Sequence, residues 1–247
     1  IKNLTLGANC RMTFWANSGG ISGYVAGRIE NCVFLGTVRG MSSSIGGIAG
    51  QIQRTTGVVS GCRNDGRILS GGNYPGGIAG YNYNIIENCI NNGPVVGDSI
   101  NPAHKAISAG NNAGGIVGNL NGGKVLYCVN QGSVSSSRVC GGIYGYNSGA
   151  VNVISCLNTG TVNGGKGYAT GAIGGNNPGS TGVLENNYYD GQLLTAGAVA
   201  NGSYAGCTPL ETAALTNGKP IAGLTDSLYD YTAGMYPVLK AYKDLAS

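Results

Sequence analysis

The chain has 247 residues, of which 47 are glycine and only 10% are charged, and its formal net charge is +4. The fourteen lysine and arginine residues are scattered without a run, which argues against nucleic acid as a partner. No stretch of eighteen apolar residues occurs, so the sequence predicts no membrane insertion. The hydrophobic fraction of 42% allows a packed core, which argues against a disordered low-complexity chain.

In chain order, the sequence repeats one unit that begins with "GGI" or "GAI". The isoleucine of this unit recurs at Ile21, Ile48, Ile78, Ile116, Ile143 and Ile173, with spacings of 27, 30, 38, 27 and 30 residues. Eleven to fourteen residues later comes a cysteine, at Cys32, Cys62, Cys89, Cys128 and Cys156, and Asn187 takes its place in the last unit. A period of this length indicates a repeat architecture such as a solenoid.

Residues 1–193 show no helical period, and their short β-branched clusters lie between glycine, asparagine and serine. We predict an all-β fold, a parallel β-solenoid of about six coils with three short strands each, and right-handed because parallel crossovers usually are. The opening residues Ile1, Asn3 and Leu4 match Ile29, Asn31 and Cys32. The first coil is therefore expected to be incomplete, and its open end is a candidate for self-association.

Two columns are expected to stack inside the solenoid. The five repeated cysteines are interpreted mainly as buried free thiols, with disulfides between neighbouring coils and metal binding as the less favoured alternatives. Asparagine stands two residues later in four consecutive coils, at Asn64, Asn91, Asn130 and Asn158, and predicts a hydrogen-bonded amide ladder. With a single histidine and no CxxC pair, the sequence predicts no metal site and no cofactor.

A further column, three residues after each isoleucine, alternates tyrosine with amides: Tyr24, Gln51, Tyr81, Asn119, Tyr146 and Asn176. Period-2 alternation predicts that these side chains point outward. Tyrosines on alternate coils would suit the sugar rings of an extended glycan. The alternative is a solvated surface column of residues that favour β structure.

One coil carries an insertion of about ten residues in "GDSINPAHKAISAGNN", because 27 residues separate Cys89 from Ile116. We predict that residues 97–112 protrude, that His104 and Lys105 are accessible, and that any partner site includes this loop; a passive excursion is the alternative. The ten acidic residues form no tight pair, and no nucleophile motif lies near His104. The sequence therefore favours a protein that is not an enzyme.

The period ends near residue 193, and residues 194–247 are predicted to form a small C-terminal α/β cap with one short helix. Thr208 is the expected N-cap, Pro209 the first helical residue, Glu211 completes a capping box, and Gly218 ends the helix. This segment is expected to cover the open apolar end of the last coil.

The patterns "GGIxG", "IxNC" and "NxGxV" resemble the GLUG-type repeats of bacterial surface and secreted proteins, including adhesins and IgA-peptidase-like proteins. The resemblance covers about three quarters of the chain. It implies an extracellular or bacterial cell-surface location, and an adhesin-like module that binds a glycan or a host or cell-surface protein. A rigid stalk or filament subunit is the alternative, and a polysaccharide-degrading β-helix enzyme is less favoured.

Overall fold

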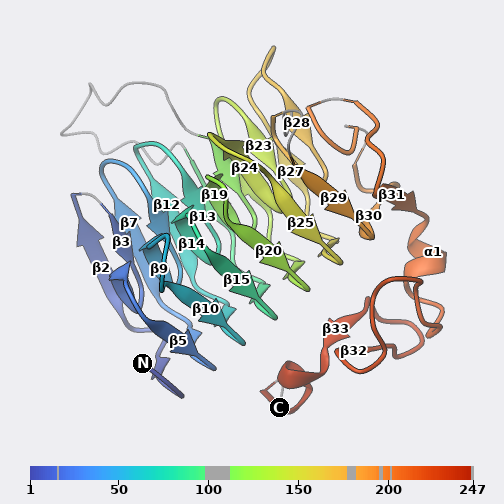
Figure 1. Cartoon of the computed structure of the whole chain (residues 1–247), viewed down its shortest axis with the longest axis horizontal. Helices are drawn as coiled ribbons and strands as arrows, with labels where there is room; N and C mark the ends of the chain where they lie inside the picture. Colours follow the sequence, from blue (N-terminus) through green and yellow to red (C-terminus); the bar gives the residue numbers. More distant parts are fainter. Residues whose placement is uncertain (16, 98–111, 177–181, 195–196, 201, 246–247) are drawn as a thin grey trace.

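A computed structural model describes residues 1–247 except 16, 98–111, 177–181, 195–196, 201 and 246–247. It confirms the predicted all-β fold: the chain winds into a parallel β-solenoid of about six turns with almost no helix. In Figure 1 the equivalent strands of successive coils lie side by side, from β2 and β5 at one end to β29 and β30 at the other.

Five strands, not the three predicted, make up each complete coil, and within the described residues they form five parallel sheets, A to E. Sheet A contains β5 (Arg28–Glu30), β10 (Val58–Ser60), β15 (Ile85–Glu87), β20 (Lys124–Leu126), β25 (Asn152–Ile154) and β29 (Val183–Glu185). Sheet B contains β1 (Thr5–Leu6), β6 (Val33–Phe34), β11 (Arg63–Asn64), β16 (Ile90–Asn91), β21 (Val129–Asn130), β26 (Leu157–Asn158), β30 (Asn187–Asp190) and β31 (Cys207–Leu210). Sheet C contains β2 (Arg11–Phe14), β7 (Thr37–Gly40), β12 (Arg67–Ser70), β17 (Val95–Val96), β22 (Val134–Ser135) and β27 (Val162–Asn163). Sheet D contains β3 (Ser18–Gly19), β8 (Ile45–Gly46), β13 (Pro75–Gly76), β18 (Ala113–Gly114), β23 (Cys140–Gly141) and β28 (Thr170–Gly171). Sheet E contains β4 (Ser22–Val25), β9 (Ala49–Ile52), β14 (Ala79–Asn82), β19 (Val117–Leu120) and β24 (Tyr144–Asn147).

The corner between sheets A and B explains why the strands are so short. In each coil the residue that precedes the cysteine column has a left-handed backbone, with φ between 52° and 59°: Asn3, Asn31, Gly61, Asn88, Tyr127, Ser155 and Asn186. Glycine and asparagine tolerate this conformation best, and they fill five of the seven places. The corner therefore divides what the sequence pattern suggested was one strand into two.

The five repeated cysteines are fully buried in one column, and none of the eight cysteines forms a disulfide bond. Each sulfur of the column donates to the carbonyl oxygen two residues earlier, as Cys89 does to Glu87 at 3.2 Å. Backbone N–H groups donate to the next thiol along the stack, as from Cys62 to Cys89 at 3.4 Å. Burial together with the neighbouring thiols raises the pKa of Cys128. In the last coil Asn187 replaces the thiol, and its Oδ1 accepts from the Cys156 N–H at 3.1 Å.

The four repeated asparagines are completely buried and hydrogen-bond from coil to coil. Asn64 Nδ2 donates to Asn91 Oδ1 at 2.7 Å, and the next two steps of the ladder are both 2.8 Å long. A Cβ on Gly77 would lie 2.3 Å from Cγ of Asn91, and the equivalent glycines of the neighbouring coils meet the ladder in the same way. In these four coils the second glycine of "GGI" is therefore required, because the amide ladder packs directly against it.

The C-terminal segment differs from its prediction in two respects. Thr208 and Pro209 do not begin a helix, because they lie in β31, which pairs in parallel with the exposed edge of β30. The helix is the single turn α1 (Thr212–Leu215), whose N-cap position is Glu211. Pairing of a strand with an open sheet edge thus outweighed the capping motif.

Beyond α1 the chain turns back along the side of the solenoid, through the antiparallel pair β32 (Tyr229–Asp230) and β33 (Val238–Leu239) and the 3-10 helix η1 (Lys240–Leu245) (Figure 1). We call residues 212–242 the strap. Its apolar residues, among them Leu224 and Tyr229, pack on the outer face of sheet B, against Ile90, Val129 and Leu157. The predicted end cap is therefore largely a lateral cover, because sheet B presents Ile90, Val129 and Leu157 on its outer face, opposite the asparagine ladder on its inner face. None of the described helices is long and apolar enough to cross a membrane.

Candidate functional site

The predicted tyrosine and amide column lies in register along sheet E. The pairs run from Tyr24 to Gln51, Tyr81, Asn119 and Tyr146 in successive coils. Tyr24 is 54% exposed, whereas Asn119 is only 1% exposed. Asn119 is in register with Tyr81 and Tyr146 on the same face of the sheet but is covered there, so the column divides into an open and a covered part.

The covered part is a hydrogen-bonded network that the sequence did not predict. Asn121 Nδ2 donates to the Tyr81 hydroxyl at 3.0 Å, and that hydroxyl lies 2.8 Å from the Ser148 hydroxyl, which donates to Asn119 Oδ1 at 3.1 Å. Tyr74 adds its ring, edge-on to Tyr81 with centroids 5.8 Å apart. These contacts bury Asn119 and hold the rings in place.

The same Tyr74 ring stacks on Tyr146 at 6.1 Å. Tyr74 reaches both rings from the turn before β13, where its φ is +58°. This turn lies between sheets C and D, outside the column, so the periodic pattern gave no signal for its ring.

The open part of the column is a pocket of about 270 Å³ lined by Tyr24, Gln51, Gln53, Arg54 and Tyr83, which we call the tyrosine pocket. The Arg54 guanidinium lies over the Tyr83 ring, 5.4 Å from its centroid, and Tyr83 stacks on Tyr81 at 4.7 Å. The tyrosine pocket therefore combines the exposed ring of Tyr24, the amides of the two glutamines and the guanidinium of Arg54. The sequence column supplied Tyr24 and Gln51, but not the turn residues that complete the pocket.

His104 and Lys105 lie outside the described residues, so their predicted role stays a prediction. The residues that flank the insertion belong to β17 and β18, which places its two ends between sheets C and D.

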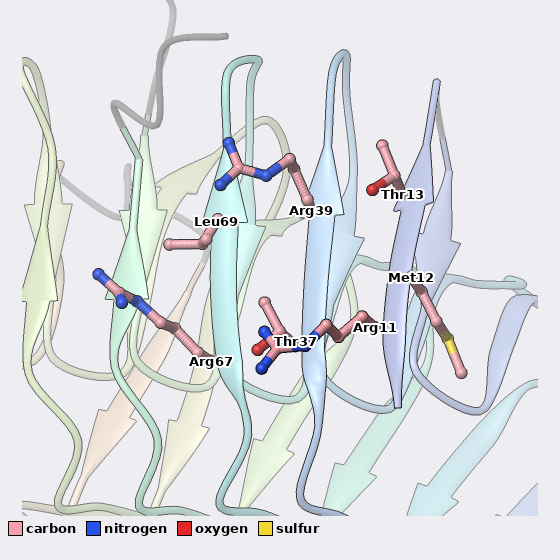
Figure 2. A pocket seen from close by; sticks show the side chains of 7 residues that line it. All are labelled: Arg11, Met12, Thr13, Thr37, Arg39, Arg67 and Leu69. Atoms are coloured by element: carbon pink, nitrogen blue, oxygen red, sulfur yellow. The ribbon is translucent and has the colours of Figure 1, made fainter. Parts of the chain in front are cut away.

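A second pocket, which the sequence analysis missed, lies on the outer face of sheet C and holds about 300 Å³ (Figure 2). It is lined by Arg11, Met12, Thr13, Thr37, Arg39, Arg67 and Leu69, and we call it the arginine pocket. These arginines form no run in the sequence, because 28 residues separate each from the next. Alignment of the repeats could have found them, since Arg11 pairs with Thr37 and Thr37 with Arg67 in successive coils.

On sheet A the carboxylate of Glu30 is held in two ion pairs. Glu30 lies 2.5 Å from Lys2 Nζ and 2.6 Å from Arg28 Nε. Hydrogen bonds from Lys2 and Arg28 lower the pKa of Glu30 to about 2. A carboxyl group with that pKa is ionised at neutral pH and is a poor general acid. Among the described residues, no group of histidine, cysteine and acidic side chains could hold a metal ion.

Comparison with known proteins supports the fold. The chain is similar to the crystal structure of a "putative immunoglobulin A1 protease" from Bacteroides ovatus, with a TM-score of 0.66 and 21% sequence identity. The match covers 97% of this chain and 74% of that one. No family model matches the chain, and no curated protein matches its sequence. At this identity the likeness shows the shared β-helical fold alone.

Proposed function

We propose that this chain is a non-catalytic, extracellular bacterial binding module that recognises glycans through the tyrosine pocket. The observation that carries the proposal is the exposed Tyr24 ring beside Gln51, Gln53 and the Arg54–Tyr83 pair. The bacterial surface setting follows from the resemblance to GLUG-type repeats and agrees with the bacterial source of the structural neighbour.

The chemistry of the tyrosine pocket suits a sugar. An exposed aromatic ring offers an apolar face for the C–H groups of a pyranose, and it loses little conformational entropy on binding. The two glutamine amides and the guanidinium offer donors and acceptors for ring hydroxyls. The rigid coils beneath fix these groups before a ligand arrives, which lowers the entropic cost of binding.

A glycan array followed by titration with a retained oligosaccharide tests the proposal. We expect Tyr24→Ala and Tyr83→Ala each to weaken binding by about tenfold, since an aromatic contact contributes roughly 1 kcal/mol or more. Tyr168→Ala is the matched control: this exposed tyrosine also has an arginine over its ring, Arg138 at 5.1 Å, but it lies between β27 and β28. If no glycan is retained, or if the control loses binding equally, the proposal is wrong.

A rigid stalk or filament subunit is the second candidate. Ile1, Leu4 and Phe14 are 56%, 38% and 38% exposed, at the end of the solenoid where β1 and β2 form sheet edges. Exposed apolar edges of this kind pair with further strands. Light scattering across a range of protein concentrations tests this candidate. Growth into long particles supports the stalk or filament. A monomer mass that stays constant with concentration shows that this chain does not assemble with itself.

A further inference from the structure

We propose that the arginine pocket on sheet C is a second binding site, separate from the tyrosine pocket, and that it takes an anionic glycan through its sulfate or carboxylate groups. The inference does not depend on the proposed function of the tyrosine pocket, because it rests on other residues of another sheet.

The register of sheet C places the three arginines on one outer face. In one column Arg11 pairs with Thr37 and Thr37 with Arg67. In the other, Thr13 pairs with Arg39 and Arg39 with Leu69.

The residues between these positions face inward, and Val38 and Ile68 are fully buried in the core. Alternation along each strand therefore turns every arginine outward. Figure 2 shows the three guanidinium groups projecting from neighbouring strands on the same side of the sheet.

This arrangement gathers positive charge in a pocket whose lining residues include no carboxylate. Three of the seven lining residues are arginine, and none is acidic. Among the described residues, neither Arg11 nor Arg67 forms an ion pair with a carboxylate, whereas Arg28 and Arg63 do. Threonine separates Arg11 from Arg67 within their column, so no two arginines face each other on adjacent strands. Gathered charges of one sign repel each other, and a bound anion would reduce that repulsion.

The spacing suits a ligand that extends along the solenoid axis. Arg11 and Arg67 stand two coils apart in one column, about 10 Å by the strand spacing, and Arg39 lies on the coil between them. Guanidinium groups bind sulfate and carboxylate in a bidentate manner. The hydroxyls of Thr13 and Thr37 lie in the same pocket and can bond to sugar hydroxyls. A polysaccharide with negatively charged groups repeated along its chain therefore matches the row formed by the three arginines.

Two further observations define the partner. The same sheet is neutral farther along, where Ser135 and Asn163 end β22 and β27, so the charge is confined to the first three coils. No aromatic side chain lines the pocket, so it lacks the stacking platform with which proteins hold single-stranded nucleic acid. These features favour an anionic glycan over nucleic acid.

The test titrates the full chain with dextran sulfate, chondroitin sulfate and neutral dextran at two salt concentrations. We expect both sulfated polymers to bind more tightly than neutral dextran, and only their binding to weaken at high salt. The triple variant Arg11→Gln, Arg39→Gln, Arg67→Gln should lose at least about tenfold in affinity, since hydrogen bonds to charged groups are the strong ones. The control variant Lys124→Gln, Lys166→Gln, Lys219→Gln removes the same charge from exposed lysines elsewhere and should change affinity by less than about twofold.

Equal losses in the two triple variants would overturn the proposal, because the binding would then follow overall charge. Binding of duplex DNA as tight as that of dextran sulfate, with the same dependence on the three arginines, would overturn the glycan assignment. Failure of both sulfated polymers to bind would overturn the site itself. Circular dichroism of the variants checks that they fold.

Discussion

The coils and the strap bury their side chains in different ways. In the coils, a residue contacts the equivalent residue of the next coil, as Asn64 contacts Asn91. In the strap, each contact occurs once: the Tyr229 hydroxyl donates to the Ser155 carbonyl at 2.8 Å, and the Tyr242 hydroxyl to the Cys62 carbonyl at 2.9 Å. A repeated sequence thus encodes its own long-range contacts, whereas the partners of the strap are defined only by the folded surface.

The largest effect is expected in the asparagine ladder. Asn91→Ala leaves the amide of Asn64 without its acceptor in the next coil and Asn130 Oδ1 without its donor, both fully buried. The free energy of unfolding should fall by about 4 kcal/mol, because each unsatisfied buried group costs up to 3 kcal/mol. Denaturant unfolding measures the loss. Asn163→Ala, at an exposed asparagine of sheet C, is the control and should change stability by less than about 0.5 kcal/mol. A loss below about 1 kcal/mol for Asn91→Ala would contradict the ladder.

Shortening a buried side chain of the strap should destabilise the strap and leave the coils intact. Tyr229 is 1% exposed, so Tyr229→Ala should weaken strap packing by about 3 kcal/mol. Hydrogen exchange should then speed up for residues 212–242 while the amides of sheets A, C and E keep their protection. Tyr229→Phe removes only the hydrogen bond to Ser155 and should cost about 1 kcal/mol. Loss of protection throughout the coils would show that the strap and solenoid unfold as one unit.

The cysteine column should be less sensitive than the asparagine ladder, although both are equally buried. Cys89→Ala removes a small apolar group and should lower the free energy of unfolding by about 1–2 kcal/mol. Because the thiols are free, a reductant should leave the unfolding midpoint of the unmodified chain unchanged. A marked drop in that midpoint on reduction would indicate disulfides instead.

The smallest effect concerns the corner before the cysteine column, where Tyr127 has a φ of +54°. Tyr127→Asn should raise the free energy of unfolding by about 0.5–1 kcal/mol, because asparagine tolerates the left-handed backbone better than tyrosine. Asn31→Ala, at the same corner of another coil, should lower it by a similar amount. If the two changes had the same sign, side-chain contacts rather than backbone conformation would control this corner.

The repeat predicted much of the interior, because a period of about 30 residues fixes which residues stack. The structure places Asn64, Asn91, Asn130 and Asn158 in one hydrogen-bonded ladder two residues after the cysteine column. Both columns could be seen in the sequence because cysteine recurs in five coils and asparagine in four consecutive coils. The number of strands per coil could not, since it depends on backbone conformation at corners such as Asn88.

The candidate sites were less accessible to sequence reasoning. Tyr24 and Gln51 were found because they share a column, but Arg54 and Tyr83 join them from turns whose geometry no period encodes. The burial of Asn119 depends on Ser148, which approaches from a turn one coil farther along. Contacts between turns follow from how the coils stack, not from local pattern.

The sequence by itself determined the solenoid and its buried cysteine and asparagine columns, because in a stacked coil the neighbour of each residue lies one period away. Only the tertiary structure decided three other features. Arg11, Arg39 and Arg67 became one charged face when the register of sheet C brought them together. Thr208 and Pro209 became a strand because the edge of β30 was open to them. The strap lies on sheet B because an apolar outer surface was available there, and the free energy of burying it depends on the folded shape rather than on any local motif.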